Sequence, residues 1–175
     1  MDFLKAITTL FLTEGKLITI SKGDYLLREG EVEKHLYSIN DGAVRAFIST
    51  DSEEITIRFG YNGSIINSLS SFITGKPSEM SLQAIRKTRL RVLTKTLFHS
   101  FVAESELNLI GYNGLLAQTI VQQIERESDL LTSAPADRLS RVLERSPDLF
   151  QHIPLKFIAS YLRMTPETLS RIRKS

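Results

Sequence analysis

IPLKFIASYLRMTPETLSRIR, residues 153–173, is the stretch that decides the fold of the C-terminal part of the chain. Pro154 suits the first position of a helix, and apolar residues then recur at helical spacing. Thr165 can cap a second helix with its hydroxyl, and Pro166 takes the first position of that helix. The segment therefore predicts two short helices joined at Arg163 and Met164, a helix-turn-helix. The facing apolar residues are Leu155, Ile158, Ala159, Leu162, Leu169 and Ile172.

The polar face of the second helix suits the major groove of DNA. Residues 156–175 carry five basic side chains against one acid, Glu167, although the net charge of the whole chain is only +2. An ordinary helical hairpin with a solvated face is the alternative. Arg163 holds the turn position, where a left-handed backbone costs about 1 kcal/mol. The candidate DNA-binding residues are Thr165, Glu167, Thr168, Ser170, Arg171 and Lys174.

The composition is that of a globular protein with one large domain or two small ones: 175 residues, 42% hydrophobic and 24% charged. Cysteine is absent, which excludes disulfides, thiolate-held clusters and thiol switches. The apolar run at the N-terminus is too weak for a secretory signal and too short to span a membrane. We therefore expect a cytoplasmic protein without a membrane partner. Phe3, Leu4, Ile7 and Phe11 are expected to form one packed helix face.

Short runs of β-forming residues fill the sequence from Leu17 to Leu93. Gly23-Asp24, Asp41-Gly42 and similar pairs fall between the runs, where tight reversals need residues that tolerate positive φ. About eight strands at roughly ten-residue spacing predict a sandwich, a jelly roll or a small barrel.

A long helix is predicted from Glu104 to Leu131. One stripe along it has alternating steps of four and three residues, the spacing of a seam against a partner helix. The stripe can pack on the chain's own β domain instead, but Leu115, Leu116 and Ile120 offer a second apolar face for that purpose, so we expect a homodimer. Ser133-Ala134-Pro135 marks a hinge, and a further helix follows over residues 137–145. The predicted dimer interface comprises Ile110, Gly114, Ala117, Val121, Ile124 and Leu131.

This order of elements resembles the Crp-Fnr family of bacterial transcription regulators, whose first domain is a cyclic-nucleotide-binding-type β-roll. Gly23-Asp24, Gly30, Leu36-Tyr37 and Gly42-x-Val44 carry the resemblance in the roll, and ASYLRMTPETLSRIRK, residues 159–174, carries it in the tail. In the family, Glu and Arg of the second helix commonly read bases, and by position Glu167 and Arg171 match them. Pro166 stands where many members have another basic reader. The chain reaches Ser175 without residues for the complete wing of such a domain.

The family's nucleotide loop holds the ribose with a glutamate and the cyclic phosphate with an arginine. The resemblance aligns this loop with residues 63–81, where Ser68 stands at the glutamate position, Ser78 at the arginine position and Glu79 next to it. A phosphate would meet a carboxylate and no guanidinium, so cyclic nucleotide binding is not expected. Leu69, Phe72 and Met80 can hold an uncharged or apolar effector, or they are plain core.

Other sites are not indicated. His35, His99 and His152 lack the spacing of a metal site, and no catalytic motif appears, so we expect no enzyme activity, no metal and no cofactor.

The predicted fold class is α+β, with a β-roll and N-terminal helix over residues 1–103, a long dimerisation helix and hinge over 104–134, and a small helix-turn-helix domain lacking a complete wing over 135–175. The expected function is that of a dimeric regulator that binds double-stranded DNA, with a small-molecule effector of unknown identity. The alternative is a ligand- or protein-binding dimer that does not bind DNA.

Overall fold

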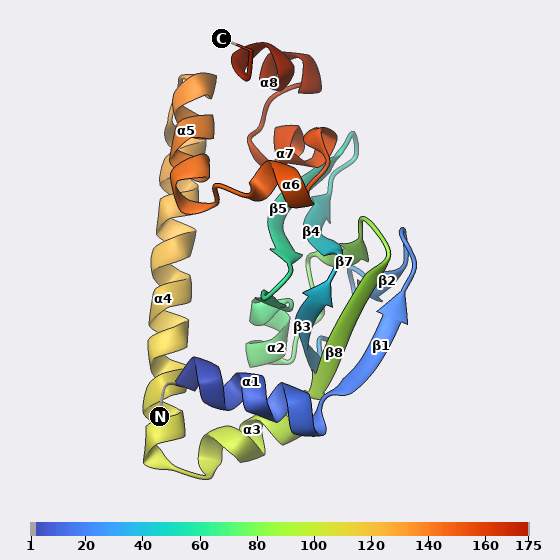
Figure 1. Cartoon of the computed structure of the whole chain (residues 1–175), viewed down its shortest axis with the longest axis vertical. Helices are drawn as coiled ribbons and strands as arrows, with labels where there is room; N and C mark the ends of the chain where they lie inside the picture. Colours follow the sequence, from blue (N-terminus) through green and yellow to red (C-terminus); the bar gives the residue numbers. More distant parts are fainter. Residues whose placement is uncertain (1–2, 175) are drawn as a thin grey trace.

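The computed structural model describes residues 3–174 and shows eight short strands followed by a helical C-terminal half (Figure 1). The strands form two four-stranded antiparallel sheets, with the orders β1-β8-β3-β6 and β2-β7-β4-β5. The predicted series of strands is confirmed. The strands are β1 (Lys16–Ile20), β2 (Tyr25–Leu27), β3 (His35–Asp41), β4 (Ala43–Ser49), β5 (Glu54–Tyr61), β6 (Ile65–Ile66), β7 (Ser81–Ala84) and β8 (Thr88–Thr94).

Apolar side chains from both sheets pack together in one cluster between the two layers. At the reversal between β3 and β4, Gly42 has φ of 99°, and a Cβ there would lie 2.5 Å from the carbonyl oxygen of Lys87. A side chain at this position is therefore excluded by both conformation and space. The buried core of the roll comprises Leu27, Tyr37, Ile39, Val44, Ala46, Ile66, Leu82 and Leu90.

Two helices close one end of the roll: α1 (Phe3–Glu14) and α3 (Lys95–Ala103). Ile7 and Phe11 are buried with Phe98 and Val102 of α3 in a second cluster. Leu4 was expected on the same face, but its side chain is 49% exposed, so that prediction is wrong. The buried residues of α1 are Ile7 and Phe11, the half-buried Phe3 packs against the same cluster, and Leu4 lies beside this stripe.

The long helix α4 (Glu106–Leu131) runs beside the roll from α3 to α5 (Figure 1). It begins two residues later than predicted because the Ser105 hydroxyl caps it, accepting from the Asn108 N–H at 3.1 Å. The next helix, α5 (Pro135–Arg145), begins two residues earlier than predicted, with Pro135 in its first turn. A short helix α6 (Leu149–His152) and the pair α7 (Leu155–Tyr161) and α8 (Pro166–Ile172) complete the chain.

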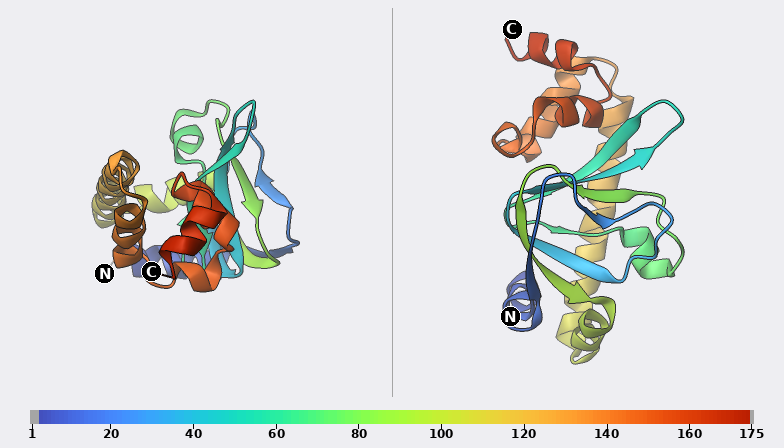
Figure 2. Two further views of the ribbon diagram at one scale, coloured as in Figure 1. Left: turned by 90° about the horizontal axis from the view of Figure 1, so that it is seen from above. Right: turned by 90° about the vertical axis from the view of Figure 1, so that its right-hand side faces the viewer.

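The C-terminal helices pack onto the roll as well as onto each other, as the two views of Figure 2 show. One cluster joins Ala43 and Ile85 of the roll region to Leu139, Val142, Leu149 and the buried residues of α7 and α8. Among the described residues, no helix combines the length and the apolar character needed to cross a membrane.

Candidate nucleic-acid interface and effector loop

The helix-turn-helix forms as its local signals predict. Thr165 caps α8, and its hydroxyl accepts from the Thr168 N–H at 3.2 Å. Pro166 takes the first turn of α8. Pro154 lies one position before α7 and serves as its N-terminal flanking residue rather than its first helical residue. Arg163 has φ of 54°, the left-handed conformation expected at the turn.

The two helices cross closely because a small residue lies between them. Ala159 is fully buried, and its carbonyl oxygen accepts from the Met164 N–H at 3.0 Å, which closes the turn. Ile158, Leu162 and Leu169 are also fully buried around it. The apolar face of α8 is therefore committed to packing, and only its opposite face is open to a partner.

The open face of α8 brings together four of the six predicted DNA-binding residues. Glu167, Ser170, Arg171 and Lys174 line a shallow surface hollow together with Pro166, and the two basic side chains are exposed. Thr165 and Thr168 lie at the N-terminal end of the helix, where their hydroxyls bond to each other at 3.2 Å. This places a glutamate, a hydroxyl and two cations on one helix face.

A buried carboxylate joins the long helix α4 to α5, the helix that precedes the helix-turn-helix. Asp129 of α4 has no exposed surface, and it forms ion pairs with Arg141 Nε at 2.8 Å and with Arg145 Nη2. Arg145 also lies 3.6 Å from the carboxylate of Glu125. The position of α5 on α4 thus depends on charged hydrogen bonds.

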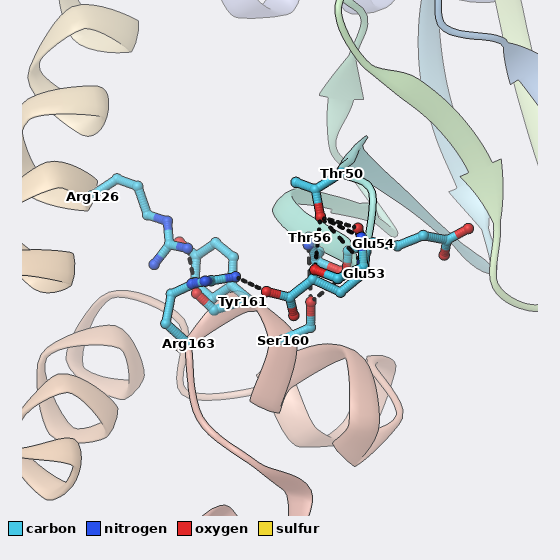
Figure 3. A network of polar contacts seen from close by, with 9 residues as sticks. Thr50, Glu53, Glu54, Thr56, Arg126, Ser160, Tyr161 and Arg163 are labelled. Carbon is cyan, nitrogen blue, oxygen red and sulfur yellow. Dashed lines mark hydrogen bonds and ion pairs between the residues drawn. The ribbon is translucent and has the colours of Figure 1, made fainter.

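The β4–β5 hairpin of the roll holds the other side of the helix-turn-helix (Figure 3). The Ser160 hydroxyl accepts from the Thr56 N–H at 3.0 Å and donates to the Glu54 carbonyl at 3.1 Å. Arg163 Nη1 lies 3.1 Å from Glu53 Oε1, so the turn between the two helices is paired with the tip of the hairpin.

The long helix contacts the same region through a cation and an aromatic ring (Figure 3). The guanidinium of Arg126 lies 3.6 Å from the ring centroid of Tyr161 and donates to the Tyr161 carbonyl oxygen. The other neighbour of this ring is Phe59 of β5, with 5.3 Å between centroids. Burial raises the pKa of Tyr161 above its usual value, so its hydroxyl stays neutral at physiological pH.

The predicted effector loop is closed by its own hydroxyls. Ser68 and Ser78 are buried, and their side-chain oxygens lie 2.8 Å apart. The Ser78 backbone is tied to the loop before β3, because its N–H donates to the Glu31 carbonyl and its carbonyl accepts from the Gly30 N–H, both at 2.8 Å. Glu79, the third residue predicted there, is exposed. Phe72 of the short helix α2 (Leu69–Thr74) belongs to the core, and Met80 packs partly against the core of the roll.

The carboxylate that faces this loop is that of Glu33, which sequence analysis missed. Glu33 is only 1% exposed, and its Oε2 accepts from the Ser68 N–H at 3.3 Å. Glu33 follows Val32 and precedes Lys34 in a polar turn, where glutamate is normally solvated. The only local signal is its position shortly before the buried run that starts at Leu36.

The predicted dimer stripe of α4 is open along its length. Ile110, Val121, Ile124 and Leu131 are 55% to 79% exposed, and a Cβ built on Gly114 would have no neighbour within 4 Å. Ile120 was expected to face the roll but is 61% exposed, so its assignment to the inward face is wrong. The close approach on the inward side occurs at Gly111, whose Cβ would meet the Phe3 side chain at 2.4 Å.

The three histidines belong to different elements, although His35 of β3 and His99 of α3 line one surface pocket. His152 stacks on Tyr61 with 4.6 Å between ring centroids, and His99 stacks on Phe72. Within residues 3–174 no group of three histidine, cysteine or acidic side chains is arranged to hold a metal ion.

Comparisons with known proteins agree with this architecture. The model of the cyclic nucleotide-binding domain family matches residues 17–105, just over half of the chain. The structure of FixK2 from Bradyrhizobium japonicum is similar, with a TM-score of 0.79 and 16% identity over 91% of this chain and 83% of that chain. A mutant of CooA from Carboxydothermus hydrogenoformans has a TM-score of 0.73 and 15% identity over 99% and 83% of the two chains.

A third similar structure is CLP of Xanthomonas campestris, described as a regulator that responds to c-di-GMP, with a TM-score of 0.70 and 16% identity over 97% of this chain and 90% of that chain. At these identities the three likenesses show a shared fold, and they confirm the predicted resemblance at that level. No curated protein sequence matches the chain significantly. The chain belongs to the cyclic nucleotide-binding domain family.

Proposed function

We propose that this member of the cyclic nucleotide-binding domain family is a dimeric, sequence-specific DNA-binding transcription regulator of the Crp-Fnr type. The observation that carries the proposal is the outer face of α8, where Glu167, Ser170, Arg171 and Lys174 gather on a helix whose other face is buried. A helix of this kind enters the major groove with its polar residues toward the base edges. Such a role is regulatory rather than enzymatic, and it places the protein in the bacterial cytoplasm.

In this proposal residues 1–103 form the effector-type roll, residues 104–134 the dimer helix and hinge, and residues 135–175 the DNA-binding domain. The exposed stripe of α4 supports the dimer, because a second copy would cover Ile110, Val121, Ile124 and Leu131 and remove that apolar surface from water. Two helix-turn-helix units related by a two-fold axis read half-sites about 34 Å apart, one turn of DNA.

The decisive experiment is selection of bound fragments from random duplex DNA, followed by affinity measurements on the selected site. Arg171→Ala should weaken binding by about 1–3 kcal/mol per half-site and relax the preference at one base pair, because arginine reads guanine through two hydrogen bonds. Lys174→Ala should weaken all sequences alike and flatten the salt dependence, as expected of a phosphate contact.

Arg173→Ala is the matched control. The Arg173 guanidinium lies 4.1 Å from the ring centroid of Phe150 and packs against the domain, so its loss should leave the base preference unchanged. If wild type selects no sequence, or if Arg171→Ala binds the selected DNA as wild type does, the chain is instead a ligand- or protein-binding dimer that does not read DNA.

Cyclic AMP and cyclic GMP are not the effectors in this proposal. Ser68 and Ser78 stand at the positions that hold the ribose and the cyclic phosphate in the family, and their hydroxyls are already bonded to each other. A bound phosphate would also lack a guanidinium partner there. Titration calorimetry should show no saturable heat at micromolar nucleotide, and a saturable signal that is abolished by a bulky replacement of Ser68 would disprove this part.

A further inference from the structure

The Glu33 carboxylate is surrounded by hydrogen-bond donors from two parts of the roll. Glu33 Oε1 accepts from the His35 N–H at 3.0 Å and from the Tyr37 hydroxyl at 3.3 Å. Glu33 Oε2 accepts from the Ser68 N–H at 3.3 Å, thirty-five residues later in the chain. The group thus connects the start of β3 to Ser68, the residue that precedes α2 within the effector loop.

The backbone of Glu33 is bound to the same loop by a separate contact. Its N–H donates to the Ser71 hydroxyl at 2.9 Å, and that hydroxyl donates to the Lys76 carbonyl at 2.5 Å. Glu33, Ser68, Ser71 and Ser78 are each at most 2% exposed. Water therefore does not satisfy these groups, and each depends on its protein partners.

We propose that the effector loop of this roll is an anion-binding site that the chain fills with its own Glu33 carboxylate. The site takes a carboxylate because the N–H groups of His35 and Ser68 donate to the two oxygens of one planar group. The Tyr37 hydroxyl lies beside them and is shared between Glu33 Oε1 at 3.3 Å and the Leu26 carbonyl at 3.1 Å. With this internal ligand in place the loop is ordered without a small molecule. The inference concerns the roll alone and holds whether or not the chain binds DNA.

Removal of the carboxylate leaves a defined vacancy. Glu33→Ala deletes Cγ, Cδ and both oxygens, which are the four heavy atoms of acetate. The His35 N–H and the Ser68 N–H then lose this buried acceptor, an unfavourable state that an added carboxylate can relieve, whereas the Tyr37 hydroxyl can still donate to the Leu26 carbonyl at 3.1 Å. A ligand that binds only the folded state raises the melting temperature with its concentration.

The test measures the melting temperature of the full-length chain near neutral pH in sodium acetate and in sodium chloride of the same ionic strength. Glu33→Ala should melt below wild type in chloride, and acetate should raise its melting temperature in a saturable manner. Wild type should respond equally to the two salts. Glu33→Leu fills the space without an acceptor and should not respond to acetate.

Glu31→Ala is the matched control, because this exposed glutamate lies in the same turn and its carboxylate accepts from the nearby Arg28 N–H at 2.7 Å. It should show no difference between the salts. The proposal is wrong if acetate affects Glu33→Ala no more than it affects Glu31→Ala, or if Glu33→Ala is as stable as wild type.

Should Glu33→Ala fail to fold in chloride, refolding in acetate is the first readout, and recovery of the fold supports the proposal. The second readout is amide hydrogen exchange in Glu33→Gln, which keeps the size of the side chain but turns one acceptor into a donor. The Ser68 or His35 amide should then exchange faster than in wild type. Unchanged exchange at both amides would overturn the proposal.

Discussion

Asp129→Asn should loosen the C-terminal helices from the long helix. Asp129 is fully buried and accepts from the guanidinium groups of Arg141 and Arg145. Each charged hydrogen bond contributes about 1.5–3 kcal/mol, and loss of one partner of a buried ion pair costs about 3–5 kcal/mol. The side chains of Arg141 and Arg145 are 42% and 34% exposed. Water can therefore solvate the two guanidinium groups after the change, which reduces the loss of stability. We expect the free energy of unfolding to fall by about 2–4 kcal/mol.

Urea denaturation followed by circular dichroism measures this loss. With a slope of about 2 kcal/mol/M, the midpoint should move down by about 1–2 M. Glu127→Gln, an exposed change on the same helix, should stay within about 0.5 kcal/mol of wild type. If Asp129→Asn and Glu127→Gln have the same midpoint, the buried ion pairs do not hold α5 on α4 and the reasoning fails.

Three other changes test the rest of the structure. Val121→Asp would bury a charge against its copy in the proposed dimer and should give monomers by sedimentation, whereas Gln122→Asp should remain dimeric. Gly42→Ala should destabilise the roll by more than about 1 kcal/mol in thermal melts, because the new Cβ meets backbone atoms at a positive φ; an unchanged melt would contradict the geometry. Burial raises the pKa of Glu33 above its ordinary 4.5, so the native state binds this proton more tightly than the unfolded chain does. Stability should therefore fall as pH rises from 4.5 through the raised value, and Glu33→Gln, which cannot titrate, should lack that component in pH-dependent denaturation.

The sign of the Glu33 effect depends on the groups around it. Desolvation opposes ionisation, while the His35, Ser68 and Lys34 N–H groups and the Tyr37 hydroxyl favour it. Burial raises the pKa of Tyr37, and the nearby carboxylates of Glu33 and Glu31 raise it further, so this hydroxyl keeps its proton and remains a donor. Burial and the neighbouring Lys34 charge lower the pKa of His35, so its ring is neutral at physiological pH.

The helix-turn-helix could be predicted because its signals are local. The cap at Thr165, the proline after it and the small Ala159 act within a few residues of their positions, and each appears as expected. Glu33 could not be predicted, since its burial depends on Ser68 and Ser71, which are more than thirty residues away. The prediction that Ile120 faces the roll was wrong for a related reason. Helical spacing defines a face of α4, but it does not tell how far along the helix the roll extends.

The turn of the helix-turn-helix shows why a residue other than glycine can be tolerated in a left-handed conformation. Arg163 adopts a left-handed backbone that costs a residue other than glycine about 1 kcal/mol. A glycine would avoid that cost but would lose the ion pair with Glu53, whose partners are 41% and 52% exposed and which therefore contributes at most about 1 kcal/mol. The two effects are of similar size, so the identity of this residue decides little about stability. The arginine also helps to position α8. Together with the Ser160 hydroxyl, which bonds to Thr56 and Glu54, the Arg163–Glu53 ion pair fixes the start of α8 relative to the β4–β5 hairpin. A displacement of that hairpin would therefore reorient the face of α8 that carries Arg171.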